Sequence, residues 1–136
     1  MEQYTILDHE ADVGFEVYGS TEEGLFQSAV CALFSLITDL DLVHPALVRR
    51  VEIDDDSSKS LIIFLNDLIY LWEVERFIPK TITLDGTGGK MAAIIMGEFL
   101  DESRHPLIND VKAVTYHQFS REEEPGRLKA TFIVDL

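Results

Sequence analysis

Cysteine, basic residues and long apolar runs are all scarce in this chain. Cys31 is its one cysteine in 136 residues, which excludes a disulfide within the chain and a zinc site built from several cysteines. The apolar, helix-like surroundings of Cys31 predict a small buried core residue rather than a reactive thiol. The polar start at residues 1–3 runs directly into a strand-like segment and does not resemble a signal peptide. No apolar run is long enough to span a bilayer. We therefore expect a cytoplasmic protein without membrane contacts.

Basic residues are outnumbered by acidic ones, 11 to 25, and the formal net charge is −14. Affinity for nucleic acid depends largely on lysine and arginine side chains that displace counterions from phosphates. The composition therefore argues against tight, direct binding of RNA or DNA. It favours metal cations or a basic protein surface as partners, and acidity that serves only solubility would give the same charge.

The pattern of apolar residues predicts one α+β domain over residues 1–136. Alternation typical of strands is found at 4–7, 13–18, 48–53, 77–84, 91–100, 111–119 and 128–135. Apolar residues at helical spacing predict one helix after Ser20 and a second after residues 54–58. We expect a two-layer domain, in which a mixed, mostly antiparallel sheet carries both helices on one face.

Each expected helix has a recognisable start and an apolar face. Ser20 with Glu23 three residues later forms a capping box, and residues 54–58 (Asp-Asp-Asp-Ser-Ser) supply acids and an N-cap for the second helix. The predicted buried faces comprise Leu25, Phe26, Ala29, Val30, Leu33, Phe34 and Ile37 in the first helix, and Leu61, Phe64, Leu65, Leu68, Ile69 and Trp72 in the second.

Carboxylates lie near both ends of the sequence. Asp12 stands just before a strand-like run, and the sequence ends with Asp135-Leu136, where a terminal carboxylate would lie beside the Asp135 side chain. If the strand next to Asp12 and the final strand are neighbours, three or more oxygen donors meet at one edge of a sheet. Crowded like charges are unfavourable unless a proton or a cation lies between them. Hard oxygen ligands suit calcium or magnesium.

Alternation along the last two strands assigns side chains to faces. Leu128, Ala130, Phe132 and Val134 share one face and look like core, which leaves Asp135 on the more polar face. Lys112 and His117 are an odd number of residues apart, so they share a face only if the strand bulges. Neither His9 nor His117 has an acid–base partner that sets it apart, and no serine or cysteine occupies a nucleophile elbow. We assign no catalytic residue.

Three segments of the sequence resemble the archease family. They are Asp8-His9-Glu10-Ala11-Asp12-Val13-Gly14, Val111-Lys112-Ala113-Val114-Thr115-Tyr116-His117 and Ile133-Val134-Asp135-Leu136. Leu25-Phe26, Ala29 and Asp39 also match family positions, and the likeness spans essentially the whole chain. Where this chain has Leu136, family members often have isoleucine, a change that leaves main-chain coordination unaffected.

The resemblance implies a function for the chain. Archeases are small acidic accessory proteins, not enzymes. They assist the tRNA-splicing RNA ligase, which uses GTP and manganese, by promoting its guanylylation and its multiple turnover. Carried over by motif, a divalent metal, expected to be calcium, would be bound by Asp12, Asp135 and the main-chain oxygen of Leu136. Lys112 would face the ligase, and Asp39 and His9 remain open as further members of the metal site.

Two other classes of function stay open at the level of sequence. One is a metal-dependent hydrolase, in which Asp12, Asp135 and a histidine would hold water on the ion, although no base-plus-ligand motif such as paired histidines is present. The other is a chaperone-like domain that shields partner proteins through exposed apolar surface.

Overall fold

The computed structural model describes residues 3–8, 12–54 and 57–136. Within these ranges the chain forms the elements β1 (Gln3–Asp8), β2 (Asp12–Gly19), α1 (Glu22–Ser35), η1 (Leu40–Leu42), β3 (Leu47–Glu52), α2 (Ser60–Glu75), β4 (Phe77–Asp85), η2 (Thr87–Gly89), β5 (Ala92–Phe99), β6 (Ala113–Glu124) and β7 (Arg127–Asp135). The predicted α+β class and the order of its elements are confirmed.

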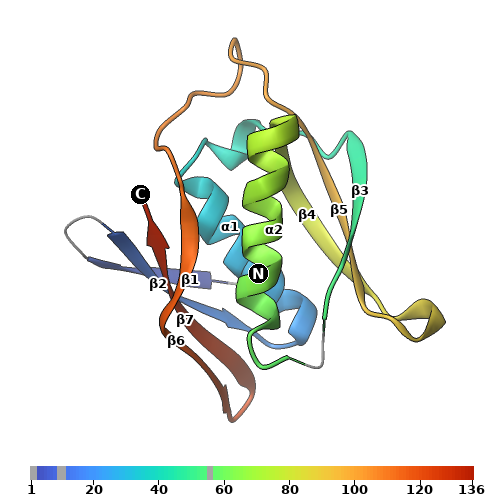
Figure 1. Ribbon diagram of the computed structural model, residues 1–136, viewed down its shortest axis with the longest axis vertical. Helices are drawn as coiled ribbons and strands as arrows, with labels where there is room; N and C mark the ends of the chain where they lie inside the picture. The colour runs from blue at the N-terminus through green and yellow to red at the C-terminus, as the bar shows by residue number, and fades with distance from the viewer. Residues whose placement is uncertain (1–2, 9–11, 55–56) are drawn as a thin grey trace.

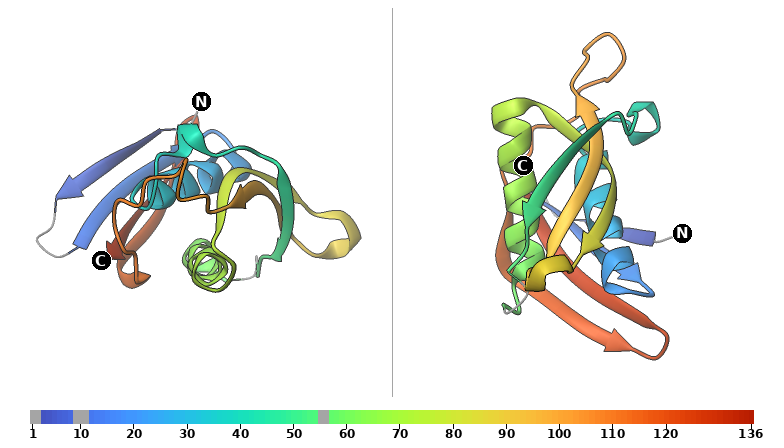
Figure 2. Two further views of the ribbon diagram at one scale, coloured as in Figure 1. Left: turned by 90° about the horizontal axis from the view of Figure 1, so that it is seen from above. Right: turned by 90° about the vertical axis from the view of Figure 1, so that its right-hand side faces the viewer.

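The described strands form two sheets instead of the single sheet expected from the sequence. One sheet has the order β1-β2-β7-β6 and the other the order β3-β5-β4, and the pairings between neighbouring strands are antiparallel. Figures 1 and 2 show α1 and α2 lying between the two sheets. The chain crosses from one sheet to the other through residues 100–112, which is why β5 and β6 do not pair although they are consecutive strands.

The core lies between the helices and the inner faces of the sheets. Phe15 pairs with Phe132 and Val17 with Ala130 across β2 and β7, and all four side chains are fully buried. The residues predicted for the apolar faces of both helices are likewise buried. Because side chains alternate along a strand, burial of Phe132 and Val134 turns Asp135 to the outer face, as predicted.

The helix starts differ from those predicted. The N-cap of α1 is Thr21, whose Oγ1 accepts a 3.0 Å hydrogen bond from the Gly24 N–H, and Glu23 instead accepts from the Leu84 N–H on β4. A β4 donor thus outcompetes the reciprocal bond of a capping box. For α2 the N-cap position is Lys59, without a side-chain capping bond. Two of the three acids expected there, residues 55–56, lie outside the described ranges.

A bulge in β6 interrupts the alternation of side chains between the two faces of this strand. The pairing of β6 with β7 shifts between Thr115 and Ser120, so residues 116–119 stand opposite a single residue of β7. Gln118, within the bulge, has a left-handed φ of 59°. Simple alternation therefore does not relate Lys112 to His117. Both side chains are exposed.

Candidate functional site

Asp12 and Asp135 are direct neighbours across β2 and β7. We call these two residues the carboxylate pair. Side chains directly opposite each other in an antiparallel sheet have Cβ atoms about 4.5–5.5 Å apart and point to the same face. Since Phe15 and Phe132 point toward the helices, the carboxylate pair points away from them. The expected gathering of oxygen donors requires the strand of Asp12 and the final strand to be neighbours, and they are.

The carboxylate pair offers hard oxygen donors in a partly open setting. Asp12 is half-buried and Asp135 is exposed, while the half-buried side chain of Leu136 packs against the core and fixes the end of β7 beside them. Like charges facing each other across strands are destabilising. Among the described residues no cluster of three or more His, Cys, Asp or Glu side chains could hold a metal. A cation at the pair would need main-chain oxygens and water as further ligands, which calcium accepts readily.

The backbone of Lys112 contacts Asp135 on the side of β7 that faces β6, opposite to the side where Asp12 lies. Its main-chain N–H donates a 2.9 Å hydrogen bond to the carbonyl oxygen of Asp135, and the next residue, Ala113, pairs with Asp135 at the start of β6. The Lys112 side chain is exposed. The structure thus brings together the backbone of Lys112 and the carboxylate pair, from three different strands or strand ends.

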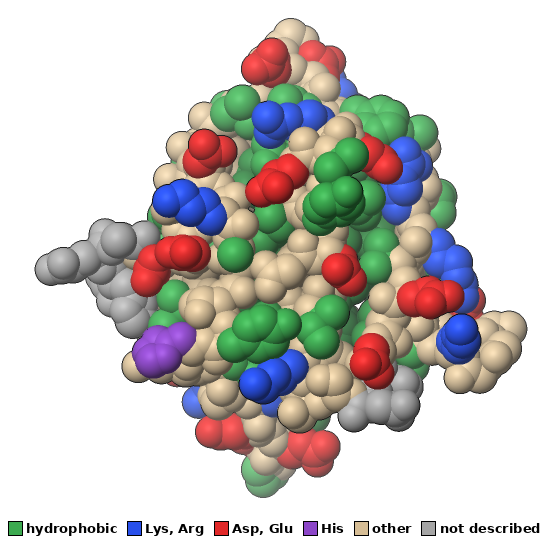
Figure 3. Space-filling view, in the orientation of Figure 1, with side chains coloured by type: hydrophobic (Ala, Val, Ile, Leu, Met, Phe, Trp, Pro, Cys, Tyr) green, Lys and Arg blue, Asp and Glu red, His purple; other side chains and the backbone are tan. Residues whose placement is uncertain are grey.

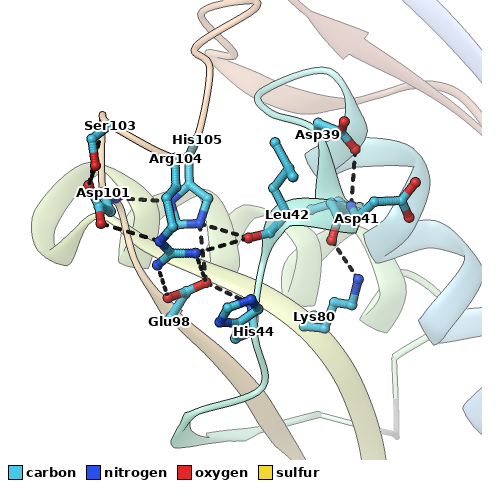
Figure 4. A network of polar contacts seen from close by, with 11 residues as sticks. Asp39, Asp41, Leu42, His44, Lys80, Glu98, Asp101, Ser103, Arg104 and His105 are labelled. Atoms are coloured by element: carbon cyan, nitrogen blue, oxygen red, sulfur yellow. Dashed lines mark hydrogen bonds and ion pairs between the residues drawn. The ribbon is translucent and has the colours of Figure 1, made fainter.

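Asp39 is placed by a different set of contacts. It caps η1, where its carboxylate accepts a 3.0 Å hydrogen bond from the Asp41 N–H. With Cys31 and Lys80 it lines a hollow of about 450 Å³. Figure 4 shows Lys80 reaching η1, where Nζ donates a 2.5 Å hydrogen bond to the Leu40 carbonyl. His9, the other open candidate, lies outside the described residues.

The prediction that Cys31 is a buried core residue is wrong. Cys31 is half-buried and not part of the core, and Gln27 Nε2 donates to its Sγ at 3.2 Å. The helical pattern could not show this, because the hollow beside α1 is made by η1 and β4, which are distant in sequence.

A second polar site was missed by the sequence reasoning. Glu98 on β5 accepts hydrogen bonds from Arg104 Nη2 at 2.6 Å and from the His44 N–H at 2.6 Å, and it lies 3.1 Å from His105 Nε2 (Figure 4). We call Glu98, Arg104 and His105 the Glu98 cluster. A glutamate that interrupts an apolar strand, with arginine and histidine six and seven residues later, was its signal in the sequence.

In the Glu98 cluster the glutamate is ionised and the ring of His105 is held in one orientation. The Arg104 guanidinium is the main cause that lowers the pKa of the Glu98 carboxyl to about 2, against the desolvation that raises it. His105 is buried, and its Nδ1 accepts the Asp101 N–H at 2.9 Å. That bond places the ring proton on Nε2, which faces both Glu98 and the Leu42 carbonyl. The cluster therefore ties residues 101–105 to β5 and to η1.

The model of the Archease protein family (MTH1598/TM1083) matches residues 4–136. The chain belongs to the archease family. Among its relatives, protein archease from Methanopyrus kandleri is 36% identical over 135 residues, 96% of each chain. Protein archease from Thermococcus gammatolerans is 33% identical over the full length of both. The resemblance stated from the three sequence segments is thereby confirmed.

Solved structures agree with this archease fold. The solution structure of Methanobacterium thermoautotrophicum protein 1598 superposes with a TM-score of 0.79 at 33% identity and covers 98% of both chains. A crystal structure of an archease from Thermotoga maritima, described as a possible chaperone, has a TM-score of 0.69 at 19% identity. It covers 96% of this chain and 94% of its own, and shows the fold alone. Within the described residues, neither helix is long and apolar enough to cross a membrane.

Proposed function

We propose that this archease is an accessory protein, not an enzyme, that activates a tRNA-splicing RNA ligase by promoting its guanylylation and multiple turnover. The observation that supports the proposal best is the carboxylate pair, with Asp12 and Asp135 in direct register on the outer face of a sheet. Family membership over residues 4–136 supplies the class of protein.

The carboxylate pair would hold a divalent cation, for which we propose calcium. Its ligands would be the side chains of Asp12 and Asp135 and the main-chain oxygen of Leu136. When bound, a divalent cation would neutralise the two facing carboxylates, so that the site would no longer repel a phosphate group. The residues themselves fix the site, because β2 and β7 hold both aspartates in register and the packed side chain of Leu136 holds the strand end.

Lys112 would supply a positive group beside the carboxylate pair. Its backbone position is set by the hydrogen bond to Asp135, whereas its exposed ammonium is free to reach a ligand. A lysine ammonium is a strong point charge for phosphates. We propose that it contacts the ligase or the bound nucleotide during guanylylation.

The net charge fits a protein partner better than RNA, and Figure 3 shows acidic side chains spread among the basic ones on one face of the molecule. At −14 the chain repels a nucleic-acid backbone and is attracted to the basic surroundings of an RNA-binding active site. Association with the ligase should therefore be fast at low salt and slower as salt screens the charges.

Single-turnover guanylylation of a purified ligase tests the proposal. The rate is measured with no archease, with wild type and with Asp135→Ala, each with added calcium and in calcium-depleted buffer that keeps the manganese that the ligase needs. We expect wild type with calcium to accelerate the reaction. With Asp135→Ala the rate should equal that measured without archease. Equal rates for wild type and Asp135→Ala would reject the role of the pair, and equal rates with and without wild type would reject activation altogether.

A further inference from the structure

Residues 100–112 connect β5 to β6, and we call them the β5–β6 loop. Figures 1 and 2 show the β5–β6 loop projecting from one end of the molecule and then descending to β6, beside the C-terminal end of β7. It contains no regular helix or strand. Irregular loops of this length in compact domains are commonly functional or disordered.

The β5–β6 loop is held by hydrogen bonds along its whole length. At its start the Leu100 N–H donates to the Arg76 carbonyl at 2.8 Å. Arg104 and His105 are held by their contacts with the Glu98 carboxylate on β5. Further on, the Ile108 N–H and Asn109 Nδ2 donate to the carbonyls of Ile37 and Leu36, just after α1, both at 2.9 Å. Such anchoring excludes the disordered alternative for these residues and indicates a preorganised surface.

Two aliphatic side chains are displayed between these anchors. Leu107 is 53% exposed and Ile108 57% exposed, although His105 and Val111 on either side are buried. The same backbone that fixes Ile108 on the end of α1 leaves its side chain in solvent. Exposure of adjacent apolar side chains gains nothing for folding, but it is not unique to this loop, since Val48 and Met96 are also exposed. What distinguishes Leu107 and Ile108 is a hollow that they line.

A hollow lies directly beside the two aliphatic residues. It has a volume of about 310 Å³ and is lined by Trp72, Arg76, Leu107, Ile108, Asn109 and Asp110. The Arg76 guanidinium lies over the Trp72 ring, 4.6 Å from its centre, and forms one wall. The space suits a protruding side chain of a partner, in the way that interface anchors fill pockets.

The position of the loop connects this surface with the carboxylate pair. Asp110 is exposed, and two residues later the loop reaches Lys112, which is hydrogen-bonded to Asp135. With a net charge of −14, the complementary surface is a basic one. The apolar anchors and Lys112, whose main-chain N–H is hydrogen-bonded to Asp135 of the carboxylate pair, therefore lie along one continuous stretch of chain.

We propose that the β5–β6 loop docks on a basic protein surface, with Leu107 and Ile108 as apolar anchors and the adjacent hollow as a receptor for one partner side chain. This inference rests on the proposed function, because the partner is the RNA ligase. The apolar anchors retain the complex once it has formed, while the charge of the chain governs its formation.

The test compares Leu107→Ser/Ile108→Ser with wild type in surface plasmon resonance on immobilised ligase. We expect the double variant to dissociate about tenfold faster or more. Its association rate and the salt dependence of that rate should stay as in wild type. The matched control is Val48→Ser/Met96→Ser, two exposed apolar residues paired across β3 and β5, which should dissociate as wild type does. Should the double variant lose near-ultraviolet circular dichroism, Ile108→Thr replaces it, with dissociation still faster than wild type.

Three results overturn the inference, and they differ from one another. Equal dissociation of wild type and the double variant rejects the loop as anchor and leaves ligase activation intact. Self-association of wild type in sedimentation, lost in the double variant, would assign the surface to a second copy of the chain. Absence of any ligase binding by wild type would reject the proposed function together with this inference.

Discussion

The carbonyl oxygen of Asp135 accepts a 2.9 Å hydrogen bond from the main-chain N–H of Lys112. This bond couples the β5–β6 loop to the last strand. The bond joins main-chain atoms, so it fixes the backbone of Lys112 and involves neither side chain. The carboxylate of Asp135 lies beside that of Asp12 on the neighbouring strand β2. Substitutions of the two side chains should therefore separate metal binding from partner contact.

Asp135→Asn should weaken calcium binding and relieve repulsion. In a chelator we expect the free energy of unfolding to be unchanged or raised by up to about 1 kcal/mol, because like charges no longer face each other. Calcium at about 100 times its dissociation constant should add about 2.7 kcal/mol to wild type and much less to the variant. Urea unfolding with and without calcium measures both effects. Glu52→Gln, an exposed acid on β3, serves as control and should respond like wild type.

Lys112→Ala should reduce activation of the ligase without loss of stability. Losing a charge-assisted hydrogen bond costs about 1.5–3 kcal/mol, or roughly a 10- to 150-fold lower stimulated guanylylation rate. The unfolding midpoint should not move, since the main-chain bond to Asp135 remains. Lys90→Ala, in the exposed hairpin between β4 and β5, is the control. A stimulated rate that Lys112→Ala leaves intact would remove Lys112 from the partner contact.

Glu98→Gln should lower stability in a pH-dependent way. The pKa of Glu98 in the folded chain is about 2, below its ordinary 4.5, so the folded state binds fewer protons than the unfolded state. The stabilisation is therefore complete above about pH 4.5 and is lost as the pH falls toward 2. We expect the variant to be about 2 kcal/mol less stable at pH 7 and equal to wild type near pH 2. Urea titrations over that range provide the comparison, and a pH-independent difference would contradict the charged role of Glu98.

Gly97→Ala should disrupt the sheet of β3, β4 and β5. An added Cβ at Gly97 would lie 1.9 Å from the Ile78 carbonyl oxygen, a backbone atom that cannot move without separating β4 from β5. We expect a loss of about 3 kcal/mol in unfolding free energy. Gly86→Ala is the matched control, because its Cβ would meet only the end of the Met91 side chain, at 3.9 Å. Similar stability of the two variants would mean that the strands shift freely.

The buried faces of the elements were determined by sequence alone. Periods of 3.6 and 2 residues correctly gave both helices and placed Phe132 and Val134 inside with Asp135 outside. The family followed from Asp12, Lys112 and Asp135 with their neighbours, and the comparison of whole chains confirms it. Local periodicity succeeds because burial of each side chain depends on the geometry of its own helix or strand.

Contacts between distant segments were decided only by tertiary structure. The register that sets Asp12 opposite Asp135 and the division into two sheets depend on pairings between strands far apart in sequence. The bulge of β6 lies in its pairing with the next strand, β7, and alternation along β6 alone does not show it. So does the Glu98 cluster, in which β5, η1 and the β5–β6 loop meet. No local pattern encodes such meetings, since they minimise the free energy of the whole packed chain and not of any one segment.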